Sequence, residues 1–126
     1  MTLILDAGAF VALERDDREM WRRLKAALRA GAVPVTHGGV VAQVWRGGAG
    51  RQALLAKALQ AVDVVALDEM LGRSAGVLLA QSGLTDAIDA AVAALARHED
   101  QIVTSDPFDL AVLVAASGRR VDVIQV

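Results

Sequence analysis

Cysteine is absent from the 126 residues of this sequence. Disulfide frameworks, zinc–thiolate sites and cysteine nucleophiles are therefore excluded, and the absence fits a reducing compartment. Aromatic residues are also scarce, with two tryptophans, two phenylalanines and no tyrosine. A surface of several exposed rings, which many proteins use to stack single-stranded nucleic acid, is therefore not expected. The core is predicted to consist mainly of alanine, valine and leucine.

Long uninterrupted apolar runs are missing as well. The first apolar run, residues 3–13, is broken by Asp6 and has no basic leader, so it does not fit a signal peptide. Later runs meet charges before reaching about 18 residues, so no membrane span is predicted. With 55% hydrophobic residues and a mean hydropathy of +0.43, the chain is expected to be a soluble cytoplasmic protein without a membrane partner. Its length suits one domain spanning residues 1–126.

The chain has no overall basic excess, because thirteen Lys and Arg face fifteen Asp and Glu, for a formal net charge of -2. Residues 1–60 nevertheless carry nine basic and five acidic side chains, whereas residues 61–126 carry four and ten. This split fits a basic surface beside an acidic pocket. Ordinary solvated helix faces are the simpler explanation on charge counts alone.

Short apolar runs alternate with helical patterns along the whole chain. Strands are predicted at residues 2–5, 32–35, 62–67, 101–104 and 121–126. Helices are predicted at residues 7–14, 17–30, 38–47, 50–60, 68–82, 85–98 and 107–117. Asp68 and Thr85 fit helix N-caps, and helix stops are expected at Gly31, Gly83 and Gly118. The alternation predicts a three-layer α/β/α sandwich with a mainly parallel, five-stranded sheet.

Four acids stand where this architecture would expose them to a ligand. Asp6 follows the first predicted strand and Asp106 the fourth, and ligands bind beyond the carboxyl ends of parallel strands. Asp86 and Asp89 are three residues apart on one predicted helix and therefore share a face. Each acid alone also has a structural explanation, as an N-cap or as a first-turn acid that complements the helix dipole.

Taken together, the acids favour a metal site. Asp6 and Asp89 lie in apolar sequence, where an isolated carboxylate is costly to bury. Two carboxylates about 4 Å apart repel by about 4 kcal/mol at an effective dielectric constant of 20, so a converging set needs a cation or shared protons. Oxygen ligands without cysteine favour Mg²⁺ or Mn²⁺, which can activate a water molecule and stabilise charge on a phosphodiester.

Three segments resemble the PIN-domain ribonucleases, and in particular the toxins of VapBC-type toxin–antitoxin pairs. They are Ile4-Leu-Asp-Ala-Gly-Ala, Thr85-Asp-Ala-Ile-Asp-Ala-Ala-Val and Val103-Thr-Ser-Asp-Pro-Phe-Asp-Leu. The resemblance implies a PIN-like fold, Mg²⁺- or Mn²⁺-dependent hydrolysis of RNA, a cognate antitoxin and a homodimer. It implies that the catalytic metal ligands are Asp6, Asp89 and Asp106. By the same resemblance Asp86 and Asp109 are auxiliary metal ligands, and Thr104 or Ser105 orients an acid or a water molecule.

Gln43 departs from the family pattern, which usually has a glutamate at the corresponding position of Val40-Val-Ala-Gln-Val-Trp-Arg-Gly. An amide can coordinate a metal but brings no negative charge, so weaker Mg²⁺ affinity is expected. Three interpretations remain open: Gln43 replaces the glutamate, Asp86 supplies the missing charge, or the nuclease is weakened. A catalytically silent module that binds RNA or an antitoxin is the alternative function.

Several other residues have two interpretations. Arg46, one turn after Gln43, could hold a phosphate or be an ordinary surface side chain. Basic residues near the second helix could contact the RNA backbone or form a solvated helix face; they are Arg15, Arg18, Arg22 and Arg23. His37 could be a base but is better explained as a satisfied or exposed histidine. His98 is expected at a helix C-terminus, and the stripe of Met20, Trp21 and Leu24 is expected to face the core or a partner.

Overall fold

The computed structural model describes residues 1–48 and 50–126, and its centre is a single five-stranded sheet. The strands are β1 (Leu3–Leu5), β2 (Val35–His37), β3 (Asp63–Val65), β4 (Gln101–Thr104) and β5 (Asp122–Gln125). Their order across the sheet is β3-β2-β1-β4-β5, and all four neighbouring pairs are parallel. The predicted parallel five-stranded sheet is therefore confirmed.

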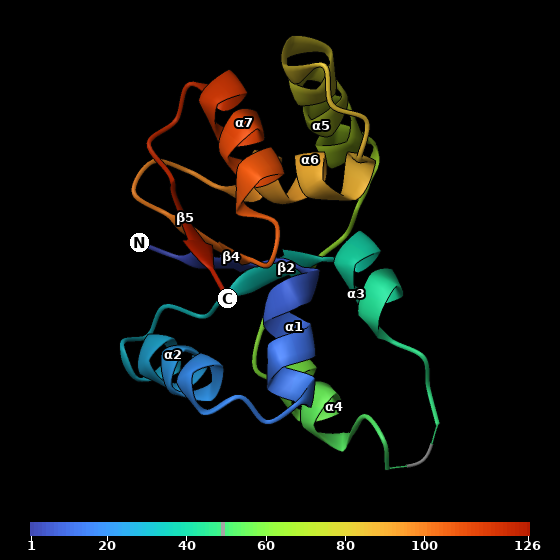
Figure 1. The fold of residues 1–126 in the computed structure, drawn as a ribbon, viewed down its shortest axis with the longest axis vertical. Coiled ribbons are helices and arrows are strands. Elements are labelled where there is room, and N and C mark those ends of the chain that lie inside the picture. Colours follow the sequence, from blue (N-terminus) through green and yellow to red (C-terminus); the bar gives the residue numbers. More distant parts are fainter. Residues whose placement is uncertain (49) are drawn as a thin grey trace.

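Helices cover both faces of this sheet (Figure 1). On one face lie α1 (Ala7–Glu14), α2 (Arg18–Arg29) and α4 (Ala53–Gln60), and on the other lie α5 (Glu69–Ser82), α6 (Ala87–Leu95) and α7 (Pro107–Ser117). The short α3 (Gly38–Val44) continues directly from β2. The three-layer α/β/α arrangement predicted from the sequence is confirmed.

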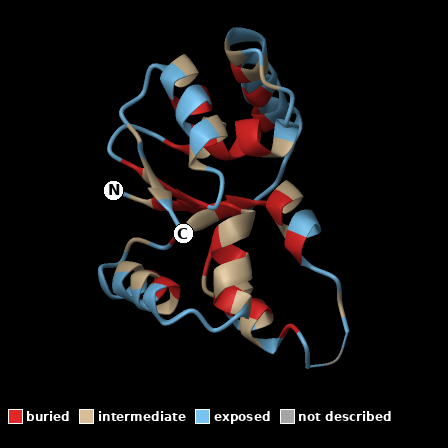
Figure 2. Ribbon diagram, viewed as in Figure 1, coloured by how far each residue is buried: buried red, intermediate tan, exposed pale blue. Residues whose placement is uncertain are grey.

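The core lies between the layers and has the composition that the sequence predicts. β1 is buried along its whole length, as is the centre of the sheet in Figure 2, and Phe10 on α1 is fully buried. On the other face, the buried stretch 90–93 of α6 reads Ala-Ala-Val-Ala. These small side chains let α5 and α7 pack closely against α6, and α6 itself contacts β1 and β2. As a result, the N-terminus of α6 and the acids around it are held against the centre of the sheet.

Helix boundaries mostly follow the predicted caps. Asp68 accepts a hydrogen bond from the backbone N–H of Leu71 at the start of α5, and Gly83 and Gly118 end α5 and α7 in the left-handed conformation. The prediction for Thr85 is wrong, because the N-cap of α6 is Asp86, whose carboxylate accepts two backbone N–H groups. The predicted second strand at residues 32–35 is also displaced. β2 begins only after Pro34, which has no N–H for the sheet ladder.

No single helix in the described part of the chain is both long and apolar enough to cross a membrane. The pair α5 and α6 meets the length and composition criteria only jointly, with a bend of 108° between the two helices. α6 is also largely buried within the protein.

Candidate functional site

At the carboxyl ends of β1 and β4, one hydroxyl group links the Asp6 carboxylate to the backbone of Asp106. The Asp6 carboxylate caps α1 by accepting the Ala7 N–H at 2.8 Å, and its second oxygen accepts the Thr104 hydroxyl at 2.8 Å. The same Thr104 oxygen accepts the backbone N–H of Asp106 at 2.9 Å. Both Asp6 and Thr104 are buried. Thr104 therefore fixes the orientation of one acid and the backbone of the other.

α6 contributes two acids with different environments. Asp86 is exposed and holds the first turn by accepting the N–H groups of Ile88 at 2.9 Å and Asp89 at 3.0 Å. Asp89 is only 8% exposed. Burial raises the pKa of the Asp89 carboxyl to about 7, and nearby charges add to this effect, those of Asp6, Asp86, Asp106 and Asp109. Burial and the neighbouring acids thus both disfavour the charged form of Asp89, which a proton or a bound cation would relieve.

Three of these carboxylates converge. Asp89, Asp106 and Asp109 each have an oxygen within 4.8 Å of the other two, and they come from α6, the end of β4 and the first turn of α7. Asp6 lies outside this group of three, although its charge acts on Asp89. A set of oxygen donors at this spacing, with one of them buried, can hold a hard divalent cation. The donor set therefore fits a metal ion, and it includes Asp109, which the sequence resemblance implies only as an auxiliary ligand.

Gly8 allows the first turn of α1 to approach the loop after β4. A Cβ atom at this position would lie 2.6 Å from the backbone nitrogen of Ser105, well inside van der Waals contact. Ser105 is exposed and stands between Thr104 and Asp106. The first turn of α1 thus packs directly against the loop that carries Asp106, which only glycine permits.

His37 is buried, and both of its ring nitrogens are used. Nδ1 accepts the Gly39 N–H at 3.0 Å at the start of α3, so Nε2 carries the proton and donates to the Ile88 carbonyl of α6 at 3.1 Å. Burial lowers the pKa of the imidazole, which keeps it neutral. His37 therefore ties α3 to α6 next to Asp89, as a satisfied histidine rather than a free base.

Gln43 is exposed on α3, and Arg46 follows it by one turn. The Arg46 guanidinium donates to the carbonyls of Ala42 and Trp45 and so caps the end of α3.

The sequence does not indicate a role for Gln52, which is buried. Its side chain bonds the Val44 carbonyl, the Arg46 N–H and the Glu14 carboxylate, which fixes the turn after α3 against α1. No sequence motif marks such a residue, because its three partners come together only in the fold.

The predicted basic residues lie on the face formed by α1, α2 and α4. Arg15 lines a hollow of about 540 Å³ whose wall also includes Gly8, Asp17 and Ser105, the residue before Asp106. Arg18 and Arg22 line a second hollow, of about 320 Å³. We call the second one the α2–α4 basic cluster. Its lining comprises Arg18, Trp21, Arg22, Lys25 and Lys57, and is completed by Asp16 and Leu54. The ammonium groups of Lys25 and Lys57 lie 5.9 and 5.6 Å from the centre of the Trp21 ring.

The remaining residues that the sequence singled out make contacts within the fold, away from the acids. Met20 and Leu24 are in the core, as predicted, and the half-buried Trp21 donates its indole N–H to the Leu13 carbonyl at 3.0 Å. Arg23 lies 3.9 Å from the carboxylate of Glu19. The prediction that His98 ends a helix is wrong, because α6 ends at Leu95. His98 lies in the loop after α6, where its ring accepts the Arg120 N–H.

Comparison with known proteins gives a likeness in structure only. No protein-family model and no curated protein matches the sequence. The fold is similar to that of a chain in the crystal structure of VapBC2 from Rickettsia felis bound to a DNA fragment from their promoter. The TM-score is 0.70 over 98% of both chains, at 14% sequence identity. The parallel sheet and the seven helices of the described residues therefore have the PIN-like arrangement that the sequence predicts.

Proposed function

We propose that this chain is a single PIN-like domain, residues 1–126, that hydrolyses RNA phosphodiesters and acts as the toxin of a toxin–antitoxin pair. The observation that carries the proposal is the convergence of the Asp89, Asp106 and Asp109 carboxylates beside Asp6. They meet at the edge of the sheet where parallel α/β folds bind ligands. The structural likeness to VapBC2 supports the same function.

The proposed metal ligands are the converging Asp89, Asp106 and Asp109, together with Asp6, whose charge acts on Asp89. Mg²⁺ or Mn²⁺ fits this donor set because all the side chains offer hard carboxylate oxygens. When bound, the ion would supply an activated water molecule and stabilise the charge that develops on the phosphodiester. Asp89 must lose its proton to act as a ligand, and with a pKa of about 7 it does so near neutral pH.

Residues of the chain position this chemistry. Thr104 aims one oxygen of Asp6 and fixes the backbone at Asp106, so the two strand ends keep a constant separation. Asp86 orders the first turn of α6 and brings a further negative charge close to Asp89. That charge offsets the one missing at Gln43. The cluster can therefore attract a divalent ion without a glutamate at position 43.

The RNA is proposed to approach over the face of α1. The hollow beside Ser105 leads along α1 to Arg15, whose charge complements a phosphate of the RNA backbone. We assign weaker RNA contacts to Arg46 and to Arg18 and Arg22 of the α2–α4 basic cluster. The cognate antitoxin is proposed to cover the acidic site, and the active protein is proposed to be a cytoplasmic homodimer.

The proposal is tested by incubating the purified protein with RNA and Mn²⁺. Wild type is expected to cleave RNA, and chelation by EDTA is expected to stop cleavage. Gln43→Glu is expected to raise Mg²⁺ affinity by about tenfold at most, because one added carboxylate joins several already present.

A silent binding module is the second candidate, and Gln43 is the residue that motivates it. If Gln43→Glu cleaves RNA and the wild type does not, the native protein belongs to this class. If neither protein cleaves RNA with Mn²⁺ or Mg²⁺, the nuclease proposal is wrong. Gln60→Glu, at an exposed position of α4, is the control for a carboxylate added elsewhere and is expected to change nothing.

A further inference from the structure

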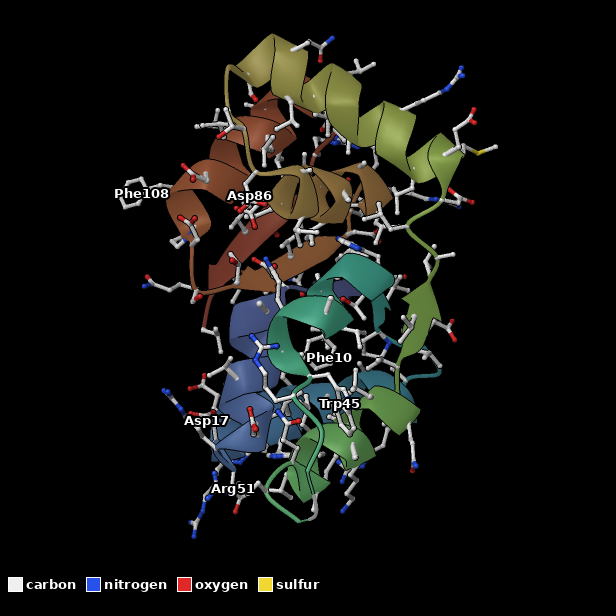
Figure 3. The ribbon with its side chains drawn as sticks, turned by 90° about the vertical axis from the view of Figure 1, so that its right-hand side faces the viewer. Phe10, Asp17, Trp45, Arg51, Asp86 and Phe108 are labelled. Atoms are coloured by element: carbon white, nitrogen blue, oxygen red, sulfur yellow. The ribbon has the colours of Figure 1, made fainter. Side chains whose placement is uncertain are left out.

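Phe108 is an exposed aromatic ring beside the acidic cluster. It is 84% exposed on the first turn of α7, whereas Phe10 is fully buried and Trp45 is 43% exposed. Figure 3 shows the Phe108 ring projecting away from the ribbon into solvent. An isolated exposed apolar side chain is ordinary on a protein surface, so exposure alone does not give the ring a role.

The position of Phe108 is what distinguishes it. Asp106 and Asp109, two of the three converging acids, flank it two residues before and one residue after. Pro107 opens α7 and the helix fixes the backbone at Phe108, so the ring has a fixed point of attachment next to the acids. A phosphate held at the acids through a metal ion would place its own nucleosides within reach of this ring.

We propose that Phe108 stacks on an unpaired RNA base next to the phosphate held at the acidic cluster. This inference rests on the proposed nuclease function and adds to it a preference for single-stranded RNA. Stacking is worth about 1–3 kcal/mol per base and tolerates any base, because every base has a π face. One ring does not make the multi-ring surface that the composition excludes, but it suffices to orient one nucleotide.

An RNA base fits the surroundings of Phe108 better than an apolar protein surface does. An apolar protein surface over Phe108 would also cover the neighbouring Asp106 and Asp109 without supplying a cation, and desolvating unpaired carboxylates is costly. A base stacked on the ring leaves those carboxylates to the cation and the phosphate. It also provides attraction that does not depend on charge, at a place where the acids alone would repel RNA.

The first test measures the binding of a single-stranded RNA oligonucleotide in the presence of Ca²⁺. Phe108→Ala is expected to weaken binding by about ten- to a hundredfold, whereas Phe108→Trp restores it and Phe108→Leu does not. The ratio between wild type and Phe108→Ala is expected to stay constant as salt is raised, because stacking releases no counterions. Val112→Ala, 45% exposed one turn further along α7, is the control and is expected to bind as wild type does.

The second test removes the base instead of the ring. Abasic nucleotides placed one at a time along the RNA should reveal one position where wild type loses affinity and Phe108→Ala loses nothing further. The proposal is overturned if no position shows this non-additivity, or if Phe108→Ala or Phe108→Leu binds as tightly as wild type. It is also overturned if Phe108→Ala and Val112→Ala both dissociate a dimer while RNA binding is unchanged.

The two proposals fail in different ways. Protein that binds RNA through Phe108 but does not cleave it with Mn²⁺ contradicts the nuclease function and leaves the stacking contact intact. Protein that cleaves RNA but binds it equally well without Phe108 does the opposite. A wild type that binds no RNA contradicts both.

Discussion

Asp89→Asn is expected to abolish metal-dependent RNA cleavage and, at the same time, to make the metal-free protein more stable at pH 8. The fold raises the pKa of the Asp89 carboxyl from 3.8 to about 7. The folded protein therefore holds a proton that the unfolded chain has released, and stability falls as the pH rises from about 4 to about 7. Asparagine cannot ionise, so the variant does not lose this stability.

The size of the effect follows from the pKa. The full shift is an upper limit, because the cluster opens to solvent at Asp106 and water screens part of the repulsion. A gain on the order of 2 kcal/mol is expected at pH 8 in EDTA, measured by urea unfolding, and almost none at pH 4. Mn²⁺ should reverse the order of stability, because it binds only the folded wild type. Cleavage should fall by at least about a hundredfold.

Equal stabilities of wild type and Asp89→Asn at pH 8 would mean that burial and repulsion do not raise the pKa of the Asp89 carboxyl. Asp122→Asn provides the control, because Asp122 is an exposed acid on β5, away from the cluster. It is expected to leave both the stability and its pH dependence unchanged.

Gly8→Ala is expected to destabilise the protein by about 2–4 kcal/mol, although alanine is the better helix former. The added methyl group would lie 2.6 Å from the Ser105 backbone nitrogen, so α1 or the β4–α7 loop must move. The loop carries Asp106, and a shift there should also weaken Mn²⁺ binding. Thermal unfolding and a Mn²⁺ titration measure the two effects.

Gly72→Ala and Gly76→Ala on α5 are matched controls, since a Cβ atom at either position meets no other atom within 4 Å. Each should stabilise the protein by about 0.5–1 kcal/mol. A Gly8→Ala variant that is as stable as these controls would show that α1 and the β4–α7 loop do not approach as described.

The fold was predictable because its signals are local. Strands and helices alternate along the chain, and Asp6 and Asp106 follow the first and fourth strands, so parallel pairing alone brings these acids to one edge. The sequence predicts β2 too early because the apolar run 32–35, which includes Pro34, resembles a strand, whereas the ladder needs the N–H groups after Pro34. Likewise the polar Thr36 and His37 are buried by their partners in β1 and α6, not by their own hydrophobicity.

The detail of the site depends on contacts between distant residues. The sequence indicates the acids but not that Asp109 joins Asp89 and Asp106 while Asp6 is held by Thr104. It does not place Lys57 over Trp21, because α2 and α4 are separated by more than twenty residues. Nor does it show that Phe108 is the exposed ring and Phe10 the buried one, since both lie in apolar segments.

The most direct test of the central claim, that the converging acids hold a divalent metal, is a calorimetric titration of Mn²⁺ into metal-free protein at pH 7. Repeating it in buffers of different ionisation enthalpy measures the protons released. Saturable binding is expected, with release of about half a proton per ion, because Asp89 has a pKa of about 7 and must ionise to bind. In Asp89→Asn both the binding and the proton release should be lost. Absence of saturable binding by the wild type, or binding that Asp89→Asn leaves unchanged, would contradict the claim.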